Sequence, residues 1–127
     1  MGRITHVVDG ETVEILVNDR RMRLRLAGIE APPVTGKYMF GLRSRQSLLQ
    51  VCGGEVAVFE TRGTDREGRM LARVHCAGTD ASAEQVRRGM ASTSAQAGSE
   101  LQAIEKAARA ARRGVWSTQI STTADPQ

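Results

Sequence analysis

The segment from Arg21 to Leu26, RMRLRL, alternates arginine with methionine or leucine at every position. Successive side chains of an extended strand point to opposite faces, so this period of two predicts a half-buried strand. The arginines share one face, and solvent exposure is the simplest interpretation for most of them. The chain is therefore expected to contain a sheet with one face packed against a core.

Similar strand-like runs precede and follow this segment, separated by turns rich in Gly, Asn and Asp. Helical patterns lie between the third and fourth runs and after the fifth. The predicted strands are 4–8, 12–17, 21–29, 55–60 and 71–76, and the predicted helices are 37–51, 81–88 and a last helix that ends at Gly114. That last helix opens at Ser99, with a capping-box spacing to Gln102. The order predicts an α+β, mainly β fold, an OB-type five-stranded barrel with three helices.

The chain has 127 residues, a length that predicts one domain. We assign residues 1–117 to this domain and expect a disordered tail over 118–127, where apolar periodicity is lost. No stretch approaches the roughly 20 apolar residues of a membrane span, and the start does not resemble a signal peptide. We therefore expect a monomer that does not bind membranes. Its default location is the cytoplasm, or the periplasm or exterior if a leader has been removed.

The composition is basic, with a net charge of +4 and a sequence pI near 9.8. This balance favours an anionic partner such as nucleic acid, although a basic protein without such a partner fits equally well. Cys52 and Cys76 show no metal-ligand spacing. They can form one disulfide or remain two buried thiols, and the sequence leaves both open.

Two turns carry acidic residues directly after predicted strands. VVDGET contains Asp9 and Glu11, and GIEAPP contains Glu30. Carboxylates on two neighbouring turns can hold a divalent cation, because calcium prefers several oxygen ligands. Solvated turn acids without a ligand have the same sequence pattern, so both interpretations stay open here.

Five spaced motifs resemble the staphylococcal nuclease (thermonuclease) family. In chain order they are VVDGETVEI, RLRLAGIEAPP, TDREGRMLARV, AEQVRRGMA and ARRGVWS, and together they span residues 4–117. The segments GKYMFGLRSRQSLLQVCGG and CAGTDASAEQVRRGMA more closely resemble nuclease-like proteins encoded on bacterial conjugative plasmids. The resemblance implies the barrel fold and Ca²⁺-dependent hydrolysis of DNA and RNA.

The resemblance also implies roles for particular residues of this sequence. The metal ligands would be Glu11, Glu30 and the main-chain carbonyl of Ala31. Asp9 would lie next to these ligands without binding the metal directly. Arg25 and Arg69 would bind the phosphate as catalytic residues, because guanidinium presents a planar, permanently charged fork. Arg25 could equally be a strand-face cation paired with Glu11 or Glu30.

The sequence departs from the family pattern at the position of the general base. The family glutamate falls on Pro33, which has no titratable group and no N–H. Glu11 and Glu30 stand where the family has aspartate, and Glu67 replaces a turn tyrosine. These changes predict a slow or impaired Ca²⁺-dependent nuclease. The alternative is a catalytically inactive nucleic-acid-binding module.

Overall fold

The computed structural model describes residues 1–35 and 39–117. The tail over 118–127, and Lys37 as the start of the first helix, lie outside the described residues. The elements in chain order are β1 (Gly2–Asp9), β2 (Thr12–Val17), β3 (Arg20–Leu26), β4 (Ile29–Glu30), α1 (Met39–Cys52), β5 (Val56–Thr64), β6 (Met70–Cys76), β7 (Thr79–Asp80), α2 (Ala81–Arg87), β8 (Ser92–Thr93) and α3 (Ser99–Ala110).

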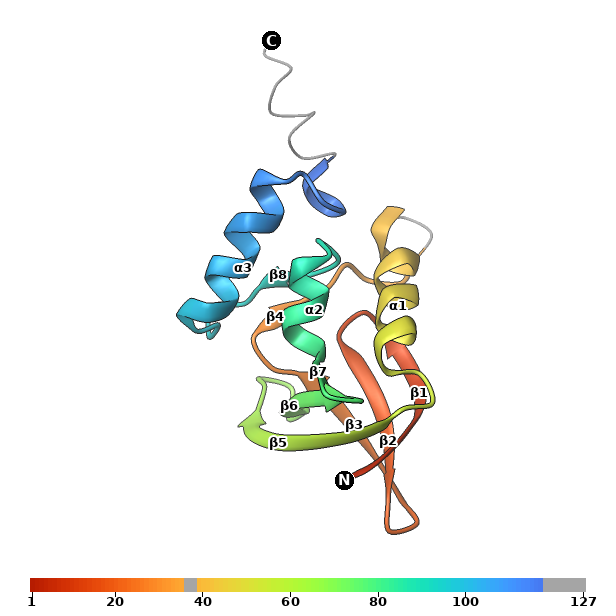
Figure 1. The fold of residues 1–127 in the computed structure, drawn as a ribbon. Coiled ribbons are helices and arrows are strands. Elements are labelled where there is room, and N and C mark those ends of the chain that lie inside the picture. The colour runs from red at the N-terminus through yellow and green to blue at the C-terminus, as the bar shows by residue number, and fades with distance from the viewer. Residues whose placement is uncertain (36–38, 118–127) are drawn as a thin grey trace.

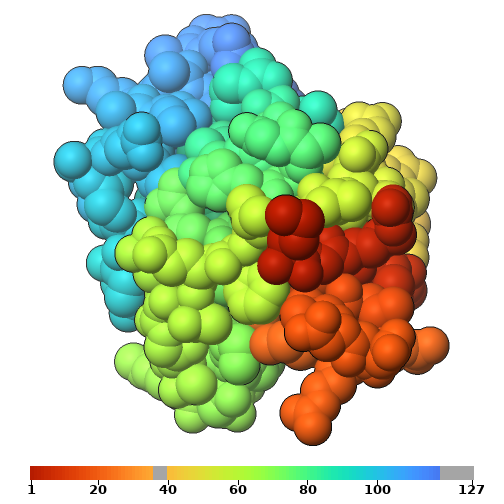
Figure 2. Space-filling view, turned by 60° about the horizontal axis from the view of Figure 1, so that its bottom comes forward, coloured from red at the N-terminus to blue at the C-terminus, as the bar shows by residue number. Residues whose placement is uncertain are grey.

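Strands β1, β2, β3, β5 and β6 form a closed barrel. The strand order is β3-β2-β1-β5-β6, and β3 pairs with β6 in parallel to close it, whereas the other pairs are antiparallel. In Figure 2 the N-terminal strand, in red, lies between the orange β2–β3 hairpin and the yellow-green β5. The α+β five-stranded barrel predicted from the sequence is confirmed.

Helices α1, α2 and α3 cover one side of the barrel, with α2 between the other two (Figure 1). The alternating strands send one set of side chains inward, where they pack against the apolar sides of the helices. Within the described residues, no helix combines the length and apolar character needed to cross a bilayer. The fully buried large side chains of this core include Ile4, Val7, Val13, Ile15, Leu24, Leu26, Leu48, Val74, Val86 and Leu101.

A disulfide joins Cys52, the last residue of α1, to Cys76, the last residue of β6. Both side chains are buried in the core cluster. Of the two states that the sequence left open, the structure therefore contains the bridged one. The bridge ties the helical layer to the barrel.

Several boundaries differ from those predicted. The strand predicted over 21–29 is broken after Leu26, and Ile29–Glu30 instead pairs with Ser92–Thr93, in the segment between α2 and α3. The predicted capping box at Ser99 is wrong. Gly98 occupies the N-cap of α3 and has no side chain to make a capping bond, and the side chain of Gln102 donates to the carbonyl of Ala97.

Helix α2 is tied to α1 through Glu84 and Arg88. Glu84 accepts hydrogen bonds from Arg87 Nε at 2.9 Å and Arg88 Nε at 2.8 Å. Arg88 Nη1 in turn donates to Ser47 Oγ at 3.2 Å and Gln50 Oε1 at 3.1 Å on α1. The hydrogen bond from Arg87, followed by that from Arg88, lowers the pKa of Glu84 to about 2, although burial opposes the shift.

We expect the substitution Glu84→Gln to lower the free energy of unfolding at neutral pH and to have no effect near pH 2. A carboxylate with a depressed pKa in the folded state contributes stability above its unfolded pKa of about 4.5, and this contribution is lost as the pH falls to about 2. Urea unfolding of both proteins across this pH range measures the difference. A difference that stays constant down to pH 2 would contradict the assignment.

Candidate functional site

The first acidic turn is fixed by contacts from its own strand and from the helices. Asp9 Oδ1 accepts the main-chain N–H of Glu11 at 2.9 Å. The buried amide of Gln85 on α2 donates to the carbonyl of Gly10 at 2.8 Å. A Cβ at position 10 would lie 1.8 Å from Ser44 Oγ on α1, so only glycine allows this close approach. The turn is thus held in one conformation before any ligand binds.

Glu11 connects the two acidic turns. Its Oε2 accepts a hydrogen bond from Arg25 Nε at 2.6 Å, and its Oε1 accepts the main-chain N–H of Ala31 at 2.6 Å. The side chains of Glu11 and Arg25 are only 13% and 16% exposed. The structure therefore brings Glu11 to the peptide that joins Glu30 to Ala31. It also pairs Arg25 with Glu11, one of the pairings considered from the sequence.

Glu30 lies on the short strand β4. Its main chain pairs with Ser92 of β8, and Ser92 Oγ donates to its carbonyl at 3.4 Å. Strand β8 is held in turn by Glu105 of α3, which accepts from Thr93 N at 2.8 Å. The backbone at Glu30 is therefore fixed, whereas its carboxylate is exposed and lines a cavity.

Asp65 brings the second predicted arginine to the first. In the turn between β5 and β6, its Oδ2 accepts from Arg69 Nε at 2.6 Å and lies 3.5 Å from Arg25 Nη1. Its Oδ1 accepts the main-chain N–H groups of Glu67 at 2.9 Å and Arg69 at 2.8 Å. Burial raises the pKa of Asp65, but these hydrogen bonds outweigh burial and hold that pKa below its ordinary value. Asp65 in turn raises the pKa of Arg69.

Asp65 and Gln85 are site-forming residues that the sequence analysis did not assign. Asp65 had a readable signal, because aspartate at the first position of a turn with glycine three residues later, Gly68, is typical of a side-chain-capped turn. Gln85 had none. Its partner Gly10 lies 75 residues away in the chain, and only the packing of α2 brings them together.

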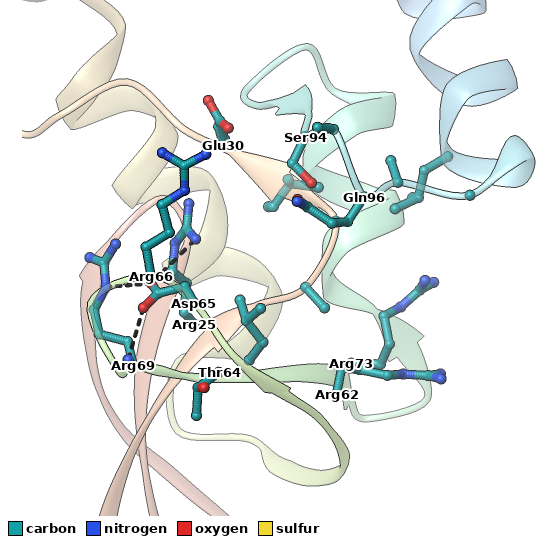
Figure 3. Close-up of a pocket in the computed structure, with 18 of the residues that line it drawn as sticks. Arg25, Glu30, Arg62, Thr64, Asp65, Arg66, Arg69, Arg73, Ser94 and Gln96 are labelled. Atoms are coloured by element: carbon teal, nitrogen blue, oxygen red, sulfur yellow. Dashed lines mark hydrogen bonds and ion pairs between the residues drawn. The ribbon is translucent and has the colours of Figure 1, made fainter.

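Of the site residues, Arg25, Glu30, Asp65 and Arg69 line a cavity of about 880 Å³ between the barrel and the segment that leads into α3. Figure 3 shows Arg25, Asp65, Arg66 and Arg69 grouped at one end, with Glu30 above them and Asp65 linked to its partners by dashed lines. An open cavity with arginines beside exposed and paired carboxylates is suited to an anionic ligand.

The family model for staphylococcal nuclease homologues matches residues 23–118 of this chain. The chain belongs to the staphylococcal nuclease family. Among similar proteins, an uncharacterized endonuclease of Escherichia coli O157:H7 is 31% identical over 119 residues, covering 91% of this chain and 76% of its own. A micrococcal nuclease of Shigella flexneri is 33% identical over 129 residues, and this match covers 91% of this chain and 73% of the relative. A probable staphylococcal-like nuclease of Oryza sativa subsp. japonica is 29% identical over 99 residues, and this match covers 76% of this chain and 29% of the relative.

The family resemblance places Pro33 at the position of the glutamate in the staphylococcal nuclease pattern. It is exposed, and its carbonyl accepts the N–H of Thr35 at 3.0 Å. The same carbonyl packs against α1, where a Cβ at Gly41 would lie 2.0 Å from it. The backbone at this position is thus well supported, but the side chain offers no group that can accept a proton.

Glu67 occupies the position of the turn tyrosine in the same pattern. Its Oε1 accepts from Arg69 Nη2 at 2.7 Å, and its side chain is 73% exposed. Arg69 is therefore paired with both Asp65 and Glu67, as Arg25 is paired with both Glu11 and Asp65. A phosphate that binds these arginines has to compete with carboxylates that already neutralise them.

The donor set around the acidic turns fits calcium in its chemistry. Glu11, Glu30 and the carbonyl of Ala31 supply only oxygen, the ligand atom that calcium prefers. The described residues contain no group of three or more His, Cys, Asp or Glu side chains that could hold a metal ion. Water or phosphate oxygens would therefore have to complete the shell, and an ion would share Glu11 with Arg25.

Proposed function

We propose that this protein is a slow, Ca²⁺-dependent nuclease that hydrolyses phosphodiester bonds of DNA or RNA. The observation that carries the proposal is the position of the Glu11 carboxylate, bonded at once to Arg25 and to the main chain of Ala31. That pair of bonds unites the acidic turns and the phosphate-binding arginine in one place. The names of the relatives, which include an endonuclease and a micrococcal nuclease, support the same reaction.

In the proposed reaction Arg25 and Arg69 bind the non-bridging oxygens of the scissile phosphate. Each arginine exchanges a carboxylate partner for a phosphate oxygen, so Asp65 and Glu67 set how readily the substrate enters. The oxygen of a water molecule attacks phosphorus and gives up one proton to solvent, the bond to the leaving oxygen breaks, and the leaving alkoxide takes up one proton from solvent. Calcium, held by Glu11, Glu30 and the carbonyl of Ala31, would supply positive charge beside the phosphate.

The proposed rate is low for two reasons. Pro33 cannot take the proton of the attacking water, and general-base catalysis is typically worth about 10²–10⁴-fold in rate. Glu11 and Glu30 are each one methylene longer than aspartate, and a displacement of about 1 Å in a catalytic constellation costs on the order of 100-fold. Binding of substrate and metal is less sensitive to these changes than the chemical step.

Arg25→Gln is the decisive substitution. We expect cleavage of single-stranded DNA to require Ca²⁺, to stop when a chelator is added, and to fall on the order of 100-fold in the variant, because a charged donor to the phosphate is removed. Arg23→Gln is the matched control. It lies on the same strand and is also paired with a glutamate, Glu14 at 2.6 Å, but it does not line the cavity. Equal rates for the two variants, or cleavage unaffected by chelator, would contradict the proposal.

The second candidate is a catalytically inactive protein that binds nucleic acid through the same arginines. The absence of a proton-accepting side chain at Pro33 favours it. It predicts affinity that falls steeply with salt, because bound phosphates release counterions, without cleavage products at any calcium concentration. The same assay on the wild-type protein separates the two candidates.

A further inference from the structure

The cavity has a second basic end, formed by Arg62 of β5 and Arg73 of β6. Both side chains line the same cavity as Arg25 and Arg69. In Figure 3 they lie across the cavity from the group formed by Arg25, Asp65 and Arg69. The roles that the family resemblance implies do not include either residue.

The register of the barrel explains why Arg73 faces this cavity. Ala72 and Val74 of β6 are buried in the core, so Leu71 and Arg73, which alternate with them along the strand, point outward. Arg25 pairs with Leu71 across the parallel β3–β6 contact and faces the same side. Arg73 lies two residues further along β6, which is about 7 Å in a strand.

Strand β5 places Arg62 on the same face as Arg73. Arg62 lies two residues after Glu60, which pairs with Arg73, so alternation along β5 gives both arginines the same side of the sheet. A bulge follows at once, because Arg62 and Gly63 together lie opposite the single residue Leu71 before the pairing resumes at Thr64. Gly63 has φ +99°, a conformation that glycine adopts without strain.

Both guanidinium groups keep donors available for a ligand. Arg62 forms one ion pair, with Glu60 at 2.8 Å, in which both side chains are more than half exposed. Arg73 pairs with Asp80 through Nη2, and its side chain is 22% exposed. A guanidinium has five N–H donors, so these pairs do not exhaust either group.

We propose that Arg62 and Arg73 bind the phosphate next along a strand whose scissile phosphate is held by Arg25 and Arg69. The cavity would then take an oligonucleotide in preference to a shorter ligand. Small polar side chains, Ser94 and Gln96, line the cavity wall that faces the sugar-phosphate chain. This inference rests on the proposed function, since it extends the same substrate site.

The test compares the binding of two ligands in calcium. One is a fluorescent single-stranded oligothymidylate with cleavage-resistant phosphorothioate links, and the other is a labelled dinucleotide with a single such link. We expect Arg62→Gln and Arg73→Gln each to weaken oligonucleotide binding about fivefold, the upper end for an exposed charge pair. Dinucleotide binding should stay unchanged. Each substitution should also reduce the slope of log affinity against log salt by about 0.7.

Arg23→Gln, which removes the same charge outside the cavity, should bind both ligands like the wild type. Arg62 gives the cleaner variant because its ion pair is exposed. Because Arg73 also pairs with Asp80, we include Arg73→Lys and measure thermal unfolding to separate a loss of binding from a loss of stability. Wild-type-like binding by Arg62→Gln, or equal weakening for both ligands, overturns the inference alone. A wild-type protein that binds neither ligand at low salt overturns the proposed function as well.

Discussion

Replacing Pro33 by glutamate should raise the rate of calcium-dependent cleavage on the order of 100-fold. A carboxylate at this position supplies the missing acceptor for the proton of the attacking water, and such catalysis spans about 10²–10⁴-fold. We expect the low end of that range, because Glu11 and Glu30 keep their extra methylenes. The side chain at position 33 is exposed, and the contacts of this residue come from its carbonyl, which glutamate retains.

Pro33→Gln is the matched control, since glutamine has the size of glutamate but no charge. Single-turnover cleavage of labelled DNA at several calcium concentrations measures the rate apart from product release. Pro33→Glu combined with Arg25→Gln should lose most of the gain, because the new base needs a bound phosphate to act on. If Pro33→Glu cleaves no faster than Pro33→Gln, the surrounding site does not support the chemistry and the inactive binding module becomes the better assignment.

Reducing the disulfide between Cys52 and Cys76 should lower the free energy of unfolding by about 3 kcal/mol. The two cysteines are 24 residues apart, and their bridge limits the conformations open to the unfolded chain. The expected loss is a large share of the 5–15 kcal/mol that typically stabilises a domain. Equilibrium urea unfolding of oxidised and reduced protein at the same pH measures it.

The double variant Cys52→Ala/Cys76→Ala provides the control for this measurement. Its unfolding midpoint should match that of the reduced protein closely and should not respond to reductant. Coinciding midpoints for oxidised and reduced wild-type protein would show that the bridge does not stabilise the fold.

The parts of the fold that follow from local patterns were predictable. The alternation through Arg21–Leu26 and the order of the other runs identified the barrel strands, because the period of two is set by backbone geometry alone. The pairing of Ile29–Glu30 with Ser92–Thr93 was not predictable in this way. Each of these strands has only two residues, and their pairing depends on contacts between distant parts of the chain.

The candidate site was likewise predictable only where local sequence patterns determine it. The sequence pointed to Glu11, Glu30, Arg25 and Arg69. In the structure Glu11 bonds to Arg25 and to the main chain of Ala31, the residue after Glu30. Arg69 is linked to this group through Asp65, whose turn-capping role follows from its spacing to Gly68. The roles of all these residues in catalysis and metal binding stay predictions, since they depend on ligands.

The side-chain amide of Gln85 on α2 bonds to Gly10, and the side chain of Ser44 on α1 packs against the same glycine. The two helices thus hold the first acidic turn in place. Activity should therefore depend on how well the helical layer stays docked, and not on the barrel alone. On gentle heating or in dilute denaturant, we expect partial detachment of α1 and α2 to abolish the proposed cleavage while most of the sheet persists.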